Sequence, residues 1–222
     1  MIIVTGAAGI LGQAVVRRLA QDGLAVAALD LATEIPDGGQ ARALGGIDLT
    51  DAAAVAQAVA QVAQDGALAG LVNVAGGFVW ETLGEGDPAT YDKMFRINVQ
   101  TAANACAAAL PALREARGAV VNVAAAATLK AGAGMGAYAA SKAGVMKLTE
   151  ALAAEELDSG VRVNAVMPSI IDTPANRKDM PDADFGKWVS PDALAGVVAF
   201  LLSADAAPVT GACLPVTGGV AW

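Results

Sequence analysis

The strongest constraint on the fold is an alternation of short β-branched runs with longer alanine-rich stretches, which continues along the whole chain. This alternation predicts repeated βα units, and hence an α/β fold with a doubly wound parallel sheet and helices on both faces. The strand candidates are Ile2–Val4, Ala25–Leu29, Leu44–Ile47, Leu71–Val74, Ala119–Val123, Val161–Val166 and Cys213–Val216. The helix candidates are Leu11–Gln21, Asp51–Gln64, Tyr91–Leu113, Tyr138–Leu157 and Asp192–Ser203. A seven-stranded sheet is therefore expected, with its ligand beyond the carboxyl ends of the strands.

The chain has 222 residues, and no internal repeat, low-complexity tail or linker divides it. We therefore predict a single domain, 1–222. Its one long segment without clear periodicity, 169–190, contains Pro174, Pro181, Phe185 and Trp188. Because a long loop in a compact domain usually has a function, we expect 169–190 to be a substrate loop.

Charge and residue usage exclude several classes of function. The 14 Lys and Arg against 22 Asp and Glu give a net charge of −8, which disfavours nucleic acid and anionic membranes as partners. With no histidine, Ser-His-Asp catalysis and His-ligated metal sites are excluded, and no metal site is predicted. Cys106 and Cys213 form no CxxC pair, so both are expected to be buried, apolar residues in a reducing cytoplasm. No apolar run is long enough to span a bilayer, and we expect a soluble, cytoplasmic protein with a small-molecule substrate.

The first predicted strand runs into a glycine-rich turn that opens a helix. Gly6, Gly9 and Gly12 let the backbone approach a pyrophosphate, whose charge is stabilised by the helix N-terminus. Asp30 ends the next strand, 18 residues after Gly12, near the spacing expected for an acidic residue that binds the adenine ribose. A carboxylate there accepts hydrogen bonds from both ribose hydroxyls and repels a 2′-phosphate, which favours NAD over NADP. The alternative is a glycine turn without a ligand, followed by a solvated aspartate.

Two later strand ends fit the same cofactor cradle. Asp48 is placed to meet the adenine, and Asn73–Gly77 to pass its backbone beside the adenine ribose. For Asp48 a second interpretation stays open. Asp48, Thr50 and Asp51 precede an alanine-rich helix, and this arrangement is also typical of a helix cap.

Tyr138 and Lys142 form a YxxxK pair on a predicted helix. Residues four apart share a helix face, which brings the lysine ammonium beside the phenol and stabilises the phenolate. A tyrosine with an ordinary pKa near 10 is a poor acid–base catalyst at neutral pH, so a neighbouring cation is chemically useful. Alone, such a pair is more typical of an ordinary helix surface.

In this order along the chain, the glycine turn, Asp30, the segment Asn73–Gly76 and the Tyr138–Lys142 pair resemble the short-chain dehydrogenase/reductase family. The resemblance covers essentially the whole chain and implies a single NAD-binding Rossmann domain. It also implies that Tyr138 donates or accepts a proton, that Lys142 binds the nicotinamide ribose, and that Asn98 supports the lysine through water. For Asn98 the alternative is a residue that only breaks or caps a helix turn. The implied NAD-binding residues are Gly6, Gly9, Ile10, Leu11, Gly12, Asp30, Asp48, Leu49, Asn73, Ala75, Gly76, Tyr138, Lys142, Pro168, Ile171 and Thr173.

The chain departs from the common family pattern at two places. Its glycines read GxxGxxG rather than GxxxGxG, and Ala125 stands where the family usually has a catalytic serine, with Thr128 three residues too late. The stretch Asp172–Phe185 is similar to the corresponding loop of dihydropteridine reductases, a subgroup that also has alanine at the serine position and prefers NADH. The predicted substrate pocket comprises Ala125, Phe78, Trp80, Met135 and Trp188, and for the last four the alternative is core packing under a loop.

The first hypothesis is therefore an NADH-dependent reductase that transfers hydride to a conjugated C=N or C=O bond, with Tyr138 as proton donor. Its first candidate substrate is a quinonoid dihydropterin. The alternatives are a carbonyl or 3-oxoacyl reductase or alcohol dehydrogenase and, in another class, a non-catalytic NAD-binding regulator. Retention of Tyr138, Lys142 and Asn98 argues against the regulator. The resemblance also implies a homodimer or homotetramer, formed through the helices at 91–113 and around Tyr138.

Overall fold

The computed structural model describes residues 1–220 and has one parallel sheet in the order β3-β2-β1-β4-β5-β6-β7. The strands are β1 Ile2–Thr5, β2 Val26–Leu29, β3 Arg42–Leu44, β4 Gly70–Asn73, β5 Ala119–Val123, β6 Arg162–Pro168 and β7 Cys213–Val216. The helices are α1 Ile10–Gln21, α2 Ala52–Ala63, α3 Ala89–Phe95, α4 Thr101–Ala116, α5 Gly136–Glu155, α6 Pro174–Asp179 and α7 Pro191–Leu202. The predicted seven-stranded, doubly wound α/β fold is confirmed.

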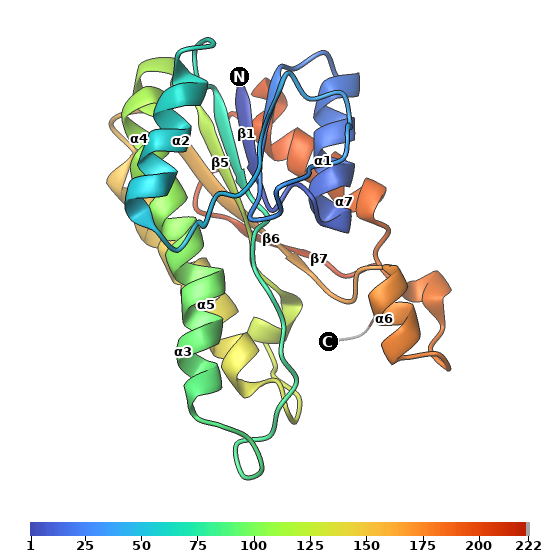
Figure 1. Cartoon of the computed structure of the whole chain (residues 1–222). Coiled ribbons are helices and arrows are strands. Elements are labelled where there is room, and N and C mark those ends of the chain that lie inside the picture. The colour runs from blue at the N-terminus through green and yellow to red at the C-terminus, as the bar shows by residue number, and fades with distance from the viewer. Residues whose placement is uncertain (221–222) are drawn as a thin grey trace.

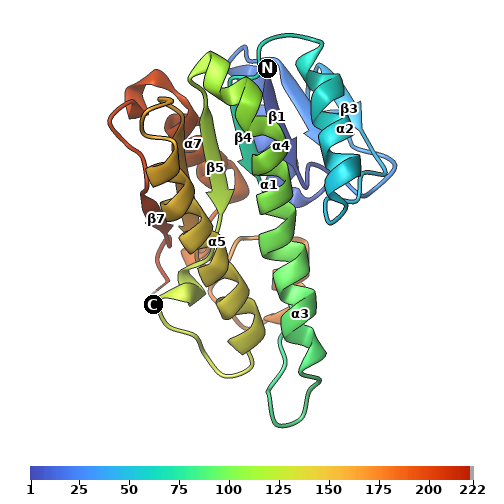
Figure 2. The same cartoon turned by 90° about the vertical axis from the view of Figure 1, so that its left-hand side faces the viewer.

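Helices cover both faces of the sheet because successive side chains of each strand point to opposite faces. Ile2 and Val4 of β1 pack into the cluster made with α1 and α7, whereas Ile3 joins the cluster made with α2 and α4. Figure 1 shows α1 and α7 side by side on one face, and Figure 2 shows α4 and α5 on the other. Both faces of β1, β2, β4 and β5 are therefore buried, as their continuous apolar runs predict, whereas the edge strands β3 and β7 are partly exposed.

The strand order reverses between β1 and its neighbour β4, so the connections that follow these two strands run to opposite faces. Such a switch point leaves a crevice at the carboxyl ends of the strands, where open α/β sheets bind ligands. α3 and α6 extend beyond this edge of the sheet on either side of it (Figure 1).

The third strand is predicted wrongly at 44–47, because it covers Arg42–Leu44. Gly45 ends it: a Cβ at this position would overlap the backbone oxygen of Thr33. Gly46 then takes a φ of +76°, which ends extended pairing. The β-branched Ile47 therefore belongs to the connection that leads to α2.

The helix predicted at 91–113 is longer and interrupted. Helical structure runs from 89 to 116, and a π-helical turn at Arg96–Gln100 separates α3 from α4. The segment 169–190 also departs from the predicted loop, since it contains α6 and a 3₁₀ turn at Phe185–Lys187. α6 begins where the Thr173 hydroxyl accepts from the Asn176 amide and Pro174 occupies the first turn.

Two expectations about the exterior of the fold can be compared with residues 1–220. Every helix in that range is too short or too polar to cross a lipid bilayer. Cys106 is buried as expected, whereas Cys213 is partly exposed and corrects the expectation that both thiols are internal.

Candidate active site

A cleft of about 1300 Å³ lies at the carboxyl edge of the sheet, at the switch point between β1 and β4. The predicted residues that line it are Gly6, Gly9, Ile10, Leu11, Gly12, Asp30, Asp48, Leu49, Ala75, Gly76, Phe78, Tyr138, Lys142, Ile171 and Thr173. Asn73 and Pro168 are buried at the carboxyl ends of β4 and β6 and do not line the cleft. The fold thus brings most of the predicted site into one cavity.

The glycine turn at the end of β1 leaves no room for a side chain at Gly6 or Gly12. Gly6 has a φ of +64°, and a Cβ there would lie 2.7 Å from Cα of Ala75. A Cβ at Gly12 would overlap the carbonyl oxygen of Gly6. Gly9 precedes α1, so the free amides of the first helical turn face the cleft. This bare backbone beside a helix N-terminus fits the pyrophosphate of a dinucleotide.

Asp30 braces the glycine turn as well as facing the cleft. Its Oδ2 accepts from the Ala8 amide at 2.8 Å, and its Oδ1 accepts from the Ala32 amide at 2.9 Å. Each carboxylate oxygen retains a further lone pair for a ribose hydroxyl.

The structure distinguishes the roles of Asp48 and Asp51, which the helix-cap interpretation had grouped together. Asp51 caps α2, while Asp48 accepts from the amide and the hydroxyl of Thr50, hydrogen bonds that hold its pKa below the ordinary value.

Tyr138 and Lys142 lie one turn apart on α5, and both side chains reach the cleft. The Lys142 ammonium is buried and donates to the Val123 carbonyl at 2.7 Å, not to the phenol. Burial raises the pKa of Tyr138 to about 12 and lowers the pKa of Lys142 to about 8. Desolvation therefore outweighs the expected stabilisation of the phenolate by Lys142.

Asn98 does more than interrupt a helix. Its Oδ1 accepts from the Gly77 amide at 2.9 Å, and its Nδ2 donates to the Gly77 carbonyl at 3.1 Å and to the Ser141 hydroxyl at 2.9 Å. Ser141 in turn donates to the Tyr138 carbonyl at 2.7 Å. Asn98 therefore joins the loop after β4 to the helix that carries Tyr138. The role of Ser141 was not predicted, although its place inside YxxxK was a signal.

The five predicted substrate-pocket residues are not all in one place. Phe78 lines the cleft, and its ring centroid is 4.9 Å from that of Tyr138. Trp80 is exposed on the neighbouring loop, and Met135 precedes α5. Trp188 is buried against Phe185, outside the cleft lining, which agrees with the core-packing alternative.

The hydroxyl expected at the serine position is absent. Ala125 is buried, and the nearby Thr128 hydroxyl donates to the Ala125 carbonyl at 2.7 Å. That hydrogen is therefore committed to the backbone.

Sequence reasoning also missed one wall of the cleft. This wall is one face of the continuous helical segment that starts with α3 and passes into the π-helical turn. The residues of this face that line the cleft are Ala89, Asp92, Lys93, Arg96 and Ile97. Their spacing of three or four residues is the helical period, so the signal was present. Arg96 lies at the adenine end, where its guanidinium donates to the Thr50 hydroxyl at 3.5 Å.

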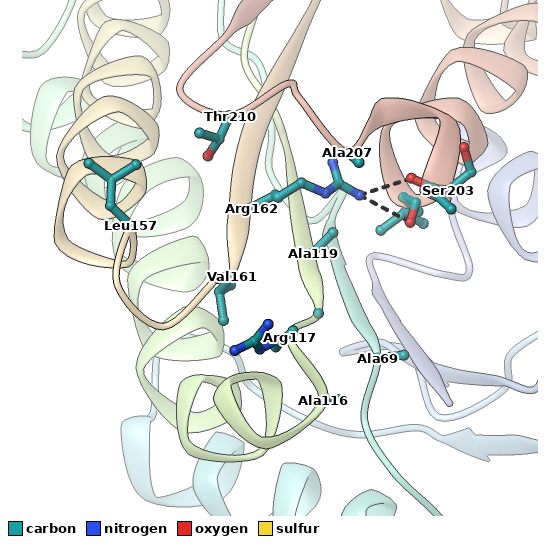
Figure 3. Close-up of a pocket in the computed structure, with 14 residues that line it drawn as sticks. Ala69, Ala116, Arg117, Ala119, Leu157, Val161, Arg162, Ser203, Ala207 and Thr210 are labelled. Carbon is teal, nitrogen blue, oxygen red and sulfur yellow. Dashed lines mark hydrogen bonds between the residues drawn. The ribbon is translucent and has the colours of Figure 1, made fainter.

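A second pocket, of about 530 Å³, opens at the amino-terminal ends of β5 and β6 (Figure 3). Its Arg162 donates to the carbonyls of Leu201, Leu202 and Ser203, at the end of α7. Its guanidinium therefore satisfies helix-terminal carbonyls. This pocket lies at the opposite end of the strands from Tyr138, so its arginine stabilises the fold and does not belong to the cleft.

The fold and the cleft together define an oxidoreductase that binds a nicotinamide dinucleotide, of the class that uses a tyrosine and a lysine on one helix. Comparison with known proteins makes the assignment specific. The family model described as short chain dehydrogenase matches residues 1–184, and the chain belongs to the short-chain dehydrogenase/reductase family.

The relatives of the chain include a dehydrogenase and a reductase of similar length. It is 38% identical to 4-formylbenzenesulfonate dehydrogenase TsaC1/TsaC2 of Comamonas testosteroni, over 98% of this chain and 96% of that protein. It is 34% identical to acetoacetyl-CoA reductase of Synechocystis, over 98% and 95%. Among solved structures, the aldohexose dehydrogenase of Thermoplasma acidophilum has a TM-score of 0.87 at 27% identity, covering 98% of this chain and 92% of that one. None of these three is named a dihydropteridine reductase.

Proposed function

We propose that the protein interconverts a conjugated carbonyl and its alcohol with NAD(H), and that Tyr138 carries the proton. The observation that carries this proposal is a single cleft lined by Tyr138 and Lys142 together with the glycine turn and Asp30. A dinucleotide supplies the hydride when it is bound there. Family membership gives the oxidoreductase class, and the choice of NAD rather than NADP rests on Asp30.

Residues of this chain can hold each part of the dinucleotide. The glycine turn faces the pyrophosphate, Asp30 the adenine ribose, and Asp48 with Leu49 the adenine. Lys142 and Thr173 are assigned to the nicotinamide ribose and carboxamide. Lys142 then has to exchange its bond with the Val123 carbonyl for a ribose hydroxyl, or share its three donors between them.

Tyr138 acts as an acid in the direction of reduction. With its pKa raised to about 12, the phenol is protonated at neutral pH and can donate to the oxygen of a substrate carbonyl. In the reverse direction the phenolate is required, and an ammonium at Lys142 lowers its free energy. Lys142 therefore matters most for alcohol oxidation.

The substrate is proposed to be conjugated because Ala125 donates no hydrogen bond to the developing oxyanion. One relative is named for a formylbenzenesulfonate, which is an aromatic aldehyde, and another for acetoacetyl-CoA, which is a 3-oxoacyl thioester. Both names support carbonyl chemistry. A quinonoid dihydropterin remains a candidate through the loop 172–185 alone, and a reducing, cytoplasmic setting is proposed from the two free cysteines.

The test is a turnover assay that follows NADH absorbance with an aromatic aldehyde, a simple ketone, a 3-oxoacyl thioester and a quinonoid dihydropterin. We expect reduction of at least one conjugated substrate, and a loss of about 10²–10⁴-fold in kcat for Tyr138→Phe. Tight NADH binding without turnover of any substrate would support the non-catalytic regulator instead. Fast reduction of the thioester alone would contradict the conjugated-substrate proposal.

A further inference from the structure

We propose that Phe78 is a fixed aromatic wall of the substrate site, braced from both sides, and that it selects planar aryl carbonyls or aryl carbinols. The proposal rests on the proposed function and names the substrate class. It depends on three sets of contacts: Phe78 with Tyr138, Gly77 with Asn98, and Trp80 with Gly134.

The Phe78 ring stands beside the reacting group and still has free surface. Its plane is inclined at 85° to the ring of Tyr138, with the centroids 4.9 Å apart, which is a favourable edge-to-face geometry. The side chain is 54% exposed and lines the cleft. A group bound at the Tyr138 hydroxyl therefore has an aromatic surface next to it.

The first brace holds the residue before Phe78. Asn98 bonds to both the amide and the carbonyl of Gly77, so the backbone on this side of Phe78 is fixed. Ile97 closes the same side, because a Cβ at Gly77 would lie 2.7 Å from the Ile97 Cδ1. Asn98 is buried, which keeps these two bonds away from water.

The second brace holds the residues after Phe78 against the loop that precedes α5. The Glu81 amide donates to the Gly134 carbonyl at 2.8 Å. The Trp80 indole covers Gly134 so closely that a Cβ there would overlap it, and Gly134 has a φ of +74°. Phe78 therefore lies between two anchored points. Tyr138 is on α5, and the second anchor, Gly134, lies on the loop directly before that helix.

A wall fixed before binding favours flat ligands. An aryl ring bound at Tyr138 can pack against Phe78 over one whole face, whereas a puckered ring of the same size touches it at a few hydrogens. Ile97, Ile171 and Pro174 make other parts of the cleft apolar. Because the wall is already ordered, little conformational entropy is lost when the aryl ring binds.

The experiment compares benzaldehyde with cyclohexanecarboxaldehyde, which differ in ring planarity and in conjugation of the carbonyl. Conjugation is the same for every variant, so the change in the ratio from wild type to variant reports the contribution of Phe78. The kcat/KM of each is measured with NADH for wild type, Phe78→Leu, Gly134→Ala and Trp80→Leu. Gly132→Ala is the matched control, because its Cβ would meet only the Met135 Sδ at an ordinary 3.8 Å. We expect wild type to prefer the aryl aldehyde by about tenfold, the upper range for one aromatic pair. Phe78→Leu should remove most of that ratio.

Gly134→Ala displaces Trp80, so it should lower the aryl preference with Phe78 intact, and Trp80→Leu should do so without strain at a positive φ. Gly132→Ala should keep the wild-type ratio. A ratio near one in wild type, or a ratio unchanged in Phe78→Leu, would overturn the proposal.

A second readout separates this proposal from the proposed function. Benzamide and cyclohexanecarboxamide are titrated into the protein with NAD⁺ present, and tryptophan fluorescence is followed. Tighter binding of benzamide, lost in Phe78→Leu, supports the aromatic wall even without turnover, and the absence of turnover then counts only against the proposed function. Equal affinities would overturn the aromatic wall whatever the turnover result.

Discussion

Burial shifts two ionisable side chains of the cleft in opposite directions: the pKa of Tyr138 rises to about 12 and that of Lys142 falls to about 8. Both shifts disfavour the charged form. Lys142 destabilises the folded state more than Tyr138 does, because its ammonium is charged at neutral pH and, among residues 1–220, donates only to the Val123 carbonyl.

Lys142→Met should therefore stabilise the fold while it lowers activity. The folded pKa lies below the ordinary value of 10.5, so the charged lysine destabilises the fold by roughly 3 kcal/mol at pH values below about 8. From pH 8 to 10.5 the unfolded chain binds the proton more tightly, and the stability of wild type rises with pH. The melting temperature of Lys142→Met should exceed that of wild type at pH 7, and the difference should shrink as pH increases.

The same change at Lys147 is the control, because that ammonium is exposed and pairs with Glu150. Lys147→Met should leave the melting temperature nearly unchanged. A lower melting temperature for Lys142→Met at pH 7 would show that the Val123 hydrogen bond outweighs the desolvation of the ammonium.

Asp30 should set cofactor choice and also support the glycine turn. We expect NADH to bind at least about tenfold tighter than NADPH, because charge-assisted bonds to the ribose contribute about 1.5 to 3 kcal/mol. Asp30→Asn removes the charge and with it the charge-assisted ribose bonds, but it keeps an acceptor for the Ala8 amide, so it should narrow the gap by weakening NADH binding while the glycine turn stays supported. Asp30→Ala should weaken both cofactors. Calorimetry measures these affinities, and equal values in wild type would contradict the assignment.

Ala125→Ser should improve simple ketones more than conjugated carbonyls. An oxyanion donor is worth about 2.7 to 4 kcal/mol when it is well placed, and Ala125 forfeits this contribution. Because Ala125 is buried and lies two residues after the end of β5, a serine hydroxyl there would start from an ordered backbone. The measurement is kcat/KM for an aliphatic ketone and an aryl aldehyde on both proteins. An equal effect on the two substrates would show that conjugation does not replace the donor.

For single residues, the sequence identifies those that belong to a spaced pattern, such as the Tyr138–Lys142 pair and Asp30. It does not reveal residues whose role depends on a contact across the fold. Ser141 acts through Asn98, which is 43 positions away, and Gly134 acts through Trp80. The position of Ser141 inside YxxxK draws attention to that residue, but no local pattern identifies its partner across the fold.

Among the elements, the π-helical turn at Arg96–Gln100 has the clearest consequence for the candidate active site. Asn98 lies within this turn, and its two bonds to Gly77 fix the loop to which Phe78 belongs, while its bond to Ser141 reaches α5. Asn98→Leu leaves the amide and carbonyl of Gly77 without partners, which should cost about 2 to 4 kcal/mol of stability.

Urea unfolding measures this cost, and Asn104→Leu is the control because that side chain makes one bond, to the Leu49 carbonyl. The Asn104 variant should lose about 1 kcal/mol. Equal losses in the two variants would show that Asn98 has no special structural role.

The long, regular elements could be predicted because their signal is local. β5 and α1 follow from a β-branched run and from helical periodicity, within one residue of the predicted bounds. The prediction of β3 fails because Ile47 has the composition of a strand, while two glycines before it bend the backbone away. α6 was missed because a helix of this length shows less than two turns of periodicity.

The oligomeric state is a property of the whole molecule. Tyr91 and Phe95, four residues apart on α3, are 40% and 54% exposed, and the neighbouring α4 presents small alanines such as Ala107. We therefore expect these helices to meet a second copy in a homodimer or homotetramer. Light scattering checks this, and Phe95→Glu should shift the mass toward the monomer. A stable wild-type monomer at micromolar concentration would contradict it.

The number of strands could be read from the sequence, but their order could not. Order depends on where the chain reverses across the sheet, and the return from β3 to the far side of β1 is made through α2, whose composition resembles that of the other helices. The cleft exists only because of this reversal. The sequence thus predicted which residues form most of the site, while their convergence is a property of the topology.

The packing of α1 against α7 has a consequence for how the protein is made. These helices cover the same face of the sheet, yet the second one begins 170 residues after the first one ends. During synthesis, the apolar residues Leu11, Val15 and Leu19 have no helical partner on that face until Pro191–Leu202 leaves the ribosome. Such a nascent chain exposes apolar, aggregation-prone surface for most of its translation. Its yield in a cell should therefore depend on holding chaperones more than on the stability of the native state.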